Sequence, residues 1–539
     1  MSRPMRFTDL VNFFERMAHR TVANHKPSER TISKKEQLEA LMDNYLEMEG
    51  TNNLYPLILL VCPDLDKQGR IYRIKHAKLA QLLSEGMLIQ NRKDRDSARL
   101  HSYQTQEQEG QGNFSNVCFD ILSKTPGRCA LDGQGKKTIK DVNEFLDALG
   151  NAAKRKGGQG EEEQKALFKE NMGMYTAKEW KWLCRIILRE MKVGISEAVT
   201  LKALHPDATE FYGCNNNNMI KVCEELKDRN QRKSSSIVLD KAFVPMMCQR
   251  PKDMKDVEKM CAKGSIYIEK KMDGERLQIH KNGNAYKLYT RKSNDYTSLY
   301  KWIIDQIERK RLIKADKCIL DAEIVGWWPG DEELHARYLP PTSLKTIGLM
   351  LGGNFKDANE SGNMSISDIS ELSGERKEKC RLCLSVFDIV QVEDNSLQKQ
   401  QLEKRLQTLD EVCKFEKHLF ERTTQIVGNT VEDAFQAIYD IGAEEEGVVL
   451  KVPSSEYQVG GRNGAGWMKM KPDYITGAND TFDVVIMGGN YGQGAVRSGR
   501  VMQYIVGVIE KNKIAENPPK IFRSFCKVGT GLERQKHWE

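Results

Sequence analysis

Near residue 240 the sequence changes from a helical pattern to short strand-like runs joined by turns. Before this point, apolar residues recur at helical spacing, as at Phe7, Leu10 and Phe14. After it, residues 277–280 alternate between apolar and polar, and an Asn-Gly pair ending at Gly283 leads into a second alternating run. This is a strong signal for an antiparallel hairpin. Two patterns in separate parts of the chain indicate a helical domain followed by an α+β domain.

The composition fits a folded protein of several domains. The chain has 539 residues, 39% of them apolar and 29% charged, and its net charge of +7 permits an acidic polymer as partner. The longest apolar run, 57–62, is too short to span a bilayer, and no secretory signal is visible at the N-terminus. The basic runs 154–156 and 309–311 are interpreted as solvated faces, with a nuclear import signal as the alternative.

Thirteen cysteines are scattered without a disulfide framework, which fits a reducing intracellular compartment. The pair Cys380 and Cys383 has Cys-x-x-Cys spacing but no second pair near it, so we interpret both as buried thiols rather than half of a metal site.

In the helical part, residues 177–193 give the strongest helix prediction. Arg185, Arg189 and Lys192 on this segment fit either contact with a phosphate backbone or an ordinary solvated face. The polar, glycine-rich stretch 150–163 is expected to be an exposed loop.

The most informative stretch is residues 269–276, Glu-Lys-Lys-Met-Asp-Gly-Glu-Arg, which follows a predicted strand at 265–268. A lysine delivered by a strand and fixed by an Asp-Gly turn is a candidate covalent nucleophile. Surface turns of this composition are common, so the stretch needs support from the rest of the chain.

Support comes from residues further along. Glu323 and Glu446 are isolated carboxylates on predicted strands, and oxygen ligands of this kind hold Mg²⁺. Phe387 is a strand aromatic of the type that stacks on a base. Lys469 and Lys471 share one face of a strand and repel each other unless a polyanion lies between them; an exposed edge strand is the alternative.

In order and spacing, these stretches resemble the motifs of the nucleotidyltransferase superfamily of ATP-dependent DNA ligases and capping enzymes. The matching stretches are residues 271–276, 289–294, 320–323, 385–388, 445–451 and 467–472. The resemblance implies that Lys271 is catalytic, attacks the α-phosphate of ATP and carries AMP. The other implied roles are adenine contacts from Glu269, Lys270 and Met272, ribose contacts from Arg276 and Glu323, base stacking by Phe387, Mg²⁺ binding by Glu323 and Glu446, phosphate contacts from Lys451, Lys469 and Lys471, and a place beside the nicked strand for Arg291.

Within the superfamily, the roughly 270 residues before Lys271 favour a DNA ligase, with an mRNA capping guanylyltransferase as the alternative. Residues 267–281 and 488–494 are most similar to the DNA ligase IV branch. That likeness implies nuclear DNA repair and recombination by non-homologous end joining, with duplex DNA carrying nicks or ends as substrate. It also implies a coiled-coil partner, whose C-terminal binding region is absent from this sequence. A DNA-end-binding scaffold without catalysis is a third reading.

The expected architecture has three parts. These are an all-α DNA-binding domain over 1–240, an α+β nucleotidyltransferase domain (ATP-grasp-like, for adenylation) over 241–477, and a partial β-barrel OB-fold over 478–539. An OB barrel needs about five strands, and we find no stretch resembling motif VI, so we expect an incomplete OB-fold. The segment 330–380, between the stretches 320–323 and 385–388, is longer than the resemblance to the family implies. We expect it to be an inserted loop region.

Overall fold

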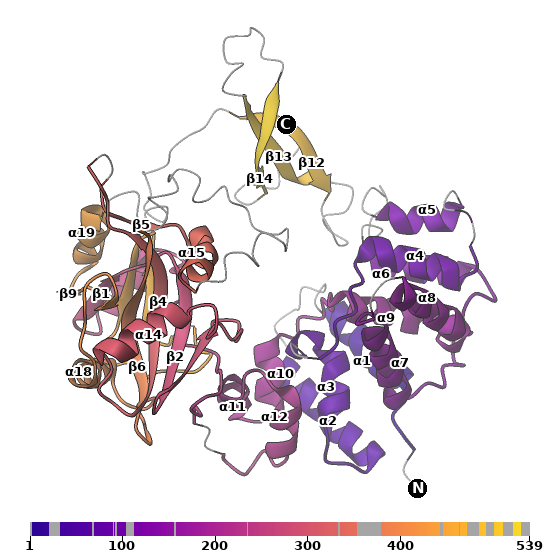
Figure 1. The fold of residues 1–539 in the computed structure, drawn as a ribbon. Helices are drawn as coiled ribbons and strands as arrows, with labels where there is room; N and C mark the ends of the chain where they lie inside the picture. Colours follow the sequence, from indigo (N-terminus) through magenta and orange to yellow (C-terminus); the bar gives the residue numbers. More distant parts are fainter. Residues whose placement is uncertain are drawn as a thin grey trace. The chain divides into compact units, whose positions relative to one another are not determined.

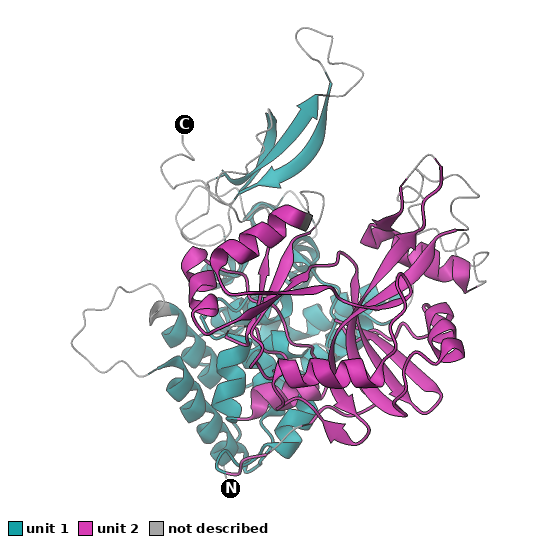
Figure 2. Ribbon diagram, turned by 90° about the vertical axis from the view of Figure 1, so that its left-hand side faces the viewer, with its two compact units in different colours: residues 1–206, 219–230, 480–539 teal, residues 207–218, 231–479 magenta. Residues whose placement is uncertain are grey.

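The computed structural model describes most of the chain. The described residues are 3–20, 33–66, 69–89, 91, 94–103, 113–155, 158–233, 236–332, 335–352, 379–441, 446–462, 464–471, 484–491, 501–509 and 521–529. The chain divides into two compact units (Figure 2). Unit 1 comprises residues 1–206, 219–230 and 480–539, and unit 2 comprises residues 207–218 and 231–479.

The first part of unit 1 is helical, as predicted. Its elements are α1 (Phe7–Arg20), α2 (Lys34–Glu49), α3 (Tyr55–Val61), η1 (Pro63–Leu65), α4 (His76–Gly86), α5 (Arg95–His101), α6 (Phe114–Lys124), α7 (Ile139–Ala152), α8 (Gln159–Asn171), η3 (Met172–Met174), α9 (Ala177–Leu188), α10 (Glu197–Leu204) and α12 (Met219–Glu225). Capping boxes at Ser33, Thr138 and Thr176 satisfy backbone donors at the starts of α2, α7 and α9. Trp180 and Trp182 of α9 are fully buried, so this helix is central to the core of the bundle.

The predicted helix over 177–193 ends early, at Leu188. Arg189 has a left-handed conformation with φ of 56° and closes the helix. Its guanidinium donates to three backbone carbonyl oxygens of residues 63–70. Arg185 is buried and donates to a serine hydroxyl and a backbone carbonyl. Both arginines therefore have hydrogen-bond partners within the protein, which contradicts an ordinary solvated face. Contact of this segment with a phosphate backbone stays a prediction.

The expected loop over 150–163 is mostly wrong. Helix α7 continues to Ala152, and α8 begins at Gln159. The polar residues of this stretch occupy the exposed face of α8, while Gln164 and Phe168 on the same helix are buried. The stretch is polar because it supplies the solvent-facing side of a helix, not because it is irregular.

Unit 1 also contains an antiparallel sheet of order β12-β13-β14. Its strands are β12 (Val485–Tyr491), β13 (Val501–Ile509) and β14 (Phe522–Val528). These strands lie within residues 478–539, where a partial OB-fold is expected.

Unit 2 is built on two sheets. The smaller, of order β11-β10-β1-β9, contains β1 (Ile266–Lys270), β9 (Gln425–Gly428), β10 (Val448–Lys451) and β11 (Trp467–Met470). The larger follows the order β3-β2-β4-β6-β7, with β5 and β8 paired to β4 and β6. It contains β2 (Glu275–Asn282), β3 (Ala285–Thr290), β4 (Lys317–Trp328), β5 (Arg337–Leu339), β6 (Arg381–Val392), β7 (Asn395–Ser396) and β8 (Phe420–Arg422). The helical elements are α11 (Ala208–Cys214), α13 (Met254–Cys261), α14 (Lys301–Lys310), η4 (Pro341–Ser343), α15 (Leu344–Leu351), α18 (Leu402–Val412) and α19 (Val431–Ile441).

Apolar packing places the two sheets of unit 2 side by side. Helices α14 and α18 cover one face of the larger sheet, and α13 and α19 cover one face of the smaller sheet (Figure 1). A third apolar cluster contains Ile319 and Val390 from the larger sheet, Trp467 from the smaller sheet, and Tyr457 from the segment between β10 and β11. Trp467 of this cluster, together with Cys248 and Phe387 packed against it, also lines the candidate site.

Strand register agrees with the sequence patterns. The hairpin of β2 and β3 turns at Gly283, whose φ of 59° suits glycine. Along β11, Met468 and Met470 pack in the core of the smaller sheet while Trp467 faces the larger sheet, which confirms the predicted alternation. Across β4 and β6, Asp321 lies directly opposite Asp388.

Two further expectations concern loops and cysteines. Cys380 and Cys383 are buried free thiols, as predicted, and the described residues contain no group of three or more side chains placed to hold a metal ion. Of the expected insertion over 330–380, residues 353–378 lie outside the described part, whereas β5, η4 and α15 within it are regular. Within the described residues, the helices are too short or too polar to cross a membrane.

Candidate active site

Lys271 lies immediately after β1, and its position is fixed by the backbone. Its N–H donates to the carbonyl oxygen of Gly447 at 2.8 Å, which continues the pairing of β1 with β10. Its ammonium donates to Glu446 Oε2, and Lys471 Nζ lies 2.8 Å from the other oxygen, Glu446 Oε1. Burial alone would raise the pKa of Glu446, but the hydrogen bonds from Lys271 and Lys471 outweigh it and hold that pKa below its usual value.

A buried ion pair lies beside this lysine. Glu269 on β1 pairs with Lys451 on β10 at 2.6 Å, with side-chain exposures of only 5% and 2%. Gln425 donates to the second oxygen of Glu269 at 3.1 Å. Burial raises the pKa of Glu269 despite the neighbouring ammonium. The Lys451 ammonium also lies 4.7 Å from the centre of the Phe387 ring and donates to the carbonyl oxygen of that residue.

A second ion pair holds the arginine of the 269–276 stretch. Arg276 on β2 binds Asp321 on β4 through two hydrogen bonds of 2.8 and 2.6 Å. This bidentate geometry fixes the plane of the guanidinium. Its central carbon lies 5.2 Å from the centre of the Phe387 ring and 5.7 Å from that of Trp467, so cationic groups from both sheets contact this pair of aromatic rings.

These groups surround one pocket with about 390 Å³ of empty space, part of it open to solvent. The lining residues are Cys248, Glu269, Lys270, Lys271, Met272, Arg276, Glu323, Phe387, Thr423, Val449, Lys451 and Trp467. Residues from β1, β2, β4, β6, β10 and β11 thus converge, and most of the residues predicted from sequence to bind a nucleotide line the pocket.

Glu323 is a carboxyl group in an unusual state. Burial raises its pKa to about 7, and the nearby Asp321 and Glu446 add to this while Lys271 and Arg276 oppose it. The carboxylates of Glu323 and Glu446, both near Lys271, can provide oxygen ligands to a metal ion. Mg²⁺ is commonly bound by one or two carboxylates together with phosphate oxygens and water, so this donor set fits Mg²⁺.

Four other predicted residues do not line the pocket: Arg291, Glu446, Lys469 and Lys471. Lys469 and Lys471 do not line it, although burial and the positive charges of Lys471 and Lys271 lower the pKa of Lys469, so the three amines are close. Arg291 is exposed and also outside the lining. Lys270 lines the pocket, but its ammonium lies 5.5 Å from the centre of the Tyr338 ring.

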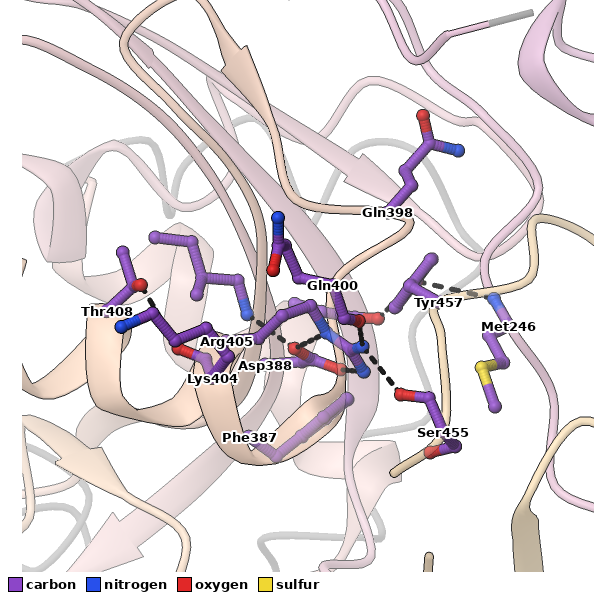
Figure 3. Close-up of polar contacts among 12 residues, drawn as sticks. Met246, Phe387, Asp388, Gln398, Gln400, Lys404, Arg405, Thr408, Ser455 and Tyr457 are labelled. Carbon is purple, nitrogen blue, oxygen red and sulfur yellow. Dashed lines mark hydrogen bonds and ion pairs between the residues drawn. The ribbon is translucent and has the colours of Figure 1, made fainter. Parts of the chain in front are cut away.

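Several residues of the site were missed in the sequence. Asp321 and Asp388 fall within the stretches 320–323 and 385–388, but the sequence assigned no role to either aspartate. Arg405 on α18 pairs with Asp388 in a fully buried ion pair, as Figure 3 shows. Tyr457 donates to Asp321 at 2.6 Å. No local pattern marks these last two residues, because their partners lie on distant strands.

Four more missed residues touch the site directly. Cys248, Thr423 and Val449 line the pocket, and Gln425 binds Glu269. Val449 alternates with Leu450 along β10, so strand periodicity could have placed it on the pocket side. Nothing in the sequence around the other three indicates a ligand.

The two parts of the chain match two ligase family models. Residues 245–471 match the ATP dependent DNA ligase domain, and residues 6–205 match the DNA ligase N terminus. The chain belongs to the ATP-dependent DNA ligases. The lysine and its pocket thus lie within the ligase domain, and the helical part corresponds to the ligase N-terminal region.

Curated relatives are similarly named. DNA ligase 4 of Gallus gallus is 31% identical over 525 residues, covering 92% of this chain and 52% of the relative. DNA ligase 4 of Homo sapiens is 30% identical over 519 residues, covering 93% and 51%. The chain spans about half the length of the curated relatives it matches. Among solved structures, a mycobacterial DNA ligase D complexed with ATP and MES aligns at 20% identity over 55% of this chain and 75% of its own, with a TM-score of 0.29.

Proposed function

We propose that this ligase chain seals nicks or ends in duplex DNA through a lysyl-AMP intermediate on Lys271, in DNA repair by non-homologous end joining. The observation that carries the proposal is the position of Lys271: it follows β1 at a pocket with a buried carboxylate, two aromatic rings and several cations. ATP presents a base, a ribose and a polyphosphate, and the pocket offers groups complementary to all three. The family match and the DNA ligase 4 relatives support this choice of substrate.

The reaction proceeds in three displacements at phosphorus. The neutral amine of Lys271 attacks the α-phosphorus of ATP, a P–N bond forms, and the bond to pyrophosphate breaks. A 5′-phosphate oxygen of the DNA then attacks the same phosphorus, which frees the amine and transfers AMP to the DNA. Finally the 3′-hydroxyl attacks the DNA 5′-phosphorus and AMP leaves. Positioning and charge neutralisation supply most of the rate in such transfers.

The chain's own residues have distinct parts in these steps. Lys271 must first lose a proton, and Glu446 Oε2 is the acceptor that its ammonium already contacts. Glu269 and the backbone of Lys270 and Met272 contact adenine, and Phe387 stacks on the base. The ribose lies against Arg276 and Glu323.

Charged groups at the edge of the pocket bind the phosphates. Lys451, Lys469 and Lys471 neutralise them, and Arg291 faces the nicked strand. Bound Mg²⁺, held by Glu323 and Glu446, supplies charge stabilisation at the phosphate oxygens.

The same proposal assigns the domains. The helical residues 1–240 bind duplex DNA through its phosphates with little sequence preference. Residues 241–477 form the nucleotidyltransferase domain, with its ATP-grasp-like adenylation function, and residues 478–539 contribute strands of an OB-fold. The protein acts in the nucleus, and its proposed protein partner is a coiled-coil end-joining factor.

Transfer of radiolabel from α-labelled nucleotide tests the proposal. The chain is incubated with Mg²⁺ and labelled ATP, GTP or NAD, beside Lys271→Ala and Lys271→Arg. The arginine variant keeps a cation next to Glu446 but lacks the amine, so it controls for loss of the ion pair. Label from ATP on the unmodified chain alone supports the proposal. Equal labelling of all three proteins refutes the role of Lys271. Label from GTP indicates a capping guanylyltransferase, and failure to label from any nucleotide together with failure to seal a pre-adenylated nick indicates a DNA-end-binding scaffold.

A further inference from the structure

The segment between β10 and β11 places one tyrosine at the centre of the apolar cluster between the two sheets of unit 2. Tyr457 is 2% exposed and does not line the pocket. Its hydroxyl donates to Asp321 Oδ2 at 2.6 Å and accepts from the backbone N–H of Met246 at 3.3 Å. The hydroxyl therefore links β4 to the segment before β1.

Each partner of this hydroxyl holds a group that lines the pocket. Asp321 uses the same oxygen, Oδ2, to accept from Arg276 at 2.6 Å. Met246 lies two residues before Cys248, and Arg276 and Cys248 both line the pocket. The Tyr457 ring also meets the Trp467 ring edge-on at 5.9 Å, and Trp467 lines the pocket. The Tyr457 side chain thus contacts Trp467 directly, and its hydroxyl contacts the residues that hold or precede Arg276 and Cys248.

The other end of the tyrosine is fixed as firmly. Its backbone N–H donates to the carbonyl of Gln398 at 2.9 Å, and the guanidinium of Arg405 lies 5.7 Å from the centre of its ring. Figure 3 shows the hydroxyl of Tyr457 beside Met246, with the ion pair of Arg405 and Asp388 close by. Because the ring cannot move easily, the direction of the hydroxyl is defined.

From these contacts we infer that Tyr457 is a positioning residue for nucleotide binding: its hydroxyl sets the orientation of Arg276 through Asp321 and holds the segment that carries Cys248. This inference rests on the proposed function, because it concerns the same pocket. Without the hydroxyl, Asp321 loses one of its donors and the buried N–H of Met246 loses its acceptor. The residues that contact base and ribose then lose their alignment, while Lys271 and Glu446, whose mutual contact involves neither Tyr457 nor its hydroxyl partners, keep that contact.

Tyr457→Phe tests this inference because it removes only one oxygen. The matched control is Tyr286→Phe, in the same unit, which also removes a buried hydroxyl with a 2.6 Å hydrogen bond, to Glu308, but far from the pocket lining. Both chains are first freed of bound AMP with pyrophosphate. The dissociation constant of AMP is then measured by calorimetry, and KM and kcat are measured for labelling by ATP.

The expected result is a rise of about tenfold in both the AMP dissociation constant and KM for Tyr457→Phe, with kcat at saturating ATP within about twofold. Tyr286→Phe should change neither constant. Asp321→Asn, which keeps an acceptor for the tyrosine but removes the charge beside Arg276, should raise the same two constants. Unchanged constants in Tyr457→Phe and Asp321→Asn overturn the inference, even if the melting temperature falls, because a purely structural role predicts only the latter.

Failure of the proposed function gives a different result. If the unmodified chain takes no label from ATP, the ligase proposal fails at this pocket. The AMP titration of Tyr457→Phe and Tyr286→Phe still decides whether Tyr457 aligns a nucleotide site.

Discussion

Replacing Arg405 with methionine should destabilise unit 2 more than almost any other single substitution in it. Arg405 and Asp388 are both 0% exposed and share two hydrogen bonds of 2.8 Å. The same guanidinium donates to the carbonyl oxygens of Gln400 and Ser455 (Figure 3). Methionine fills much of the space but supplies none of these donors.

The magnitude follows from the charge that remains. Removing one partner of a buried ion pair leaves the other charge without compensation, which costs about 3–5 kcal/mol. After Arg405→Met, the Asp388 carboxylate keeps only the N–H of Ile389 as a donor in the described structure, at 2.8 Å. The double variant Arg405→Met with Asp388→Val removes both charges, so it should lose only about 0–2 kcal/mol. Adding Asp388→Val should therefore restore about 3 kcal/mol of the stability that Arg405→Met removes.

Hydrogen exchange of β4 and β6 peptides in increasing urea measures the free energy of unfolding of this unit alone. Arg232→Met is the control, because Arg232 pairs with Asp207 at the surface of the same unit and its loss should not change this free energy measurably. A loss below about 1 kcal/mol for Arg405→Met would contradict the reasoning, and so would a double variant as unstable as the single one.

Four shorter predictions concern the candidate site. Glu323, with a pKa of about 7, binds a metal ion only as the carboxylate. Its ionised fraction rises about tenfold between pH 6 and pH 8, so Mg²⁺-dependent labelling should rise by up to about tenfold, and Glu323→Gln should lose that part of the pH profile. The folded state binds the proton of the Glu323 carboxyl more tightly than the unfolded chain does. Glu323 therefore contributes to the free energy of unfolding at low pH, and this contribution is lost as the pH rises through about 7. An unchanged pH dependence of stability in Glu323→Gln would argue against this. Glu446→Ala should reduce Mg²⁺-dependent labelling by about 100-fold or more while DNA binding, measured by fluorescence anisotropy, stays unchanged, and unchanged labelling would exclude a metal role. Glu269→Gln should lower the preference for ATP over GTP by about tenfold in kcat/KM, and an unaltered ratio would show that the buried carboxylate does not read the base.

Local patterns in the sequence predicted much of unit 2. The Asn-Gly hairpin, the strand before Lys271 and the alternation of β11 depend on neighbours in the chain, and each is confirmed. The helix over 177–193 was predicted too long because its end depends on a tertiary contact: Arg189 leaves the helix to bind carbonyl groups more than 100 residues earlier.

The candidate site divides in the same way. Residues on strands facing the pocket, such as Glu269 and Phe387, follow from alternation and order along the chain. Tyr457 and Arg405 do not, because what they contact depends on how the segment between β10 and β11 packs against α18. Residues that touch the pocket are therefore easier to predict from sequence than the residues that hold them in place.

Glu446 also determines how Lys271 rests between reactions. Each of its carboxylate oxygens already has an ammonium partner, Oε2 from Lys271 and Oε1 from Lys471. Under the proposed function, the amine of Lys271 must be without its extra proton when it attacks, because an ammonium ion has no free electron pair. Lys471 shares the negative charge of Glu446 with Lys271, and its loss would strengthen the remaining bond. The same proposal therefore predicts that Lys471, a residue outside the pocket lining, affects how readily Lys271 leaves Glu446.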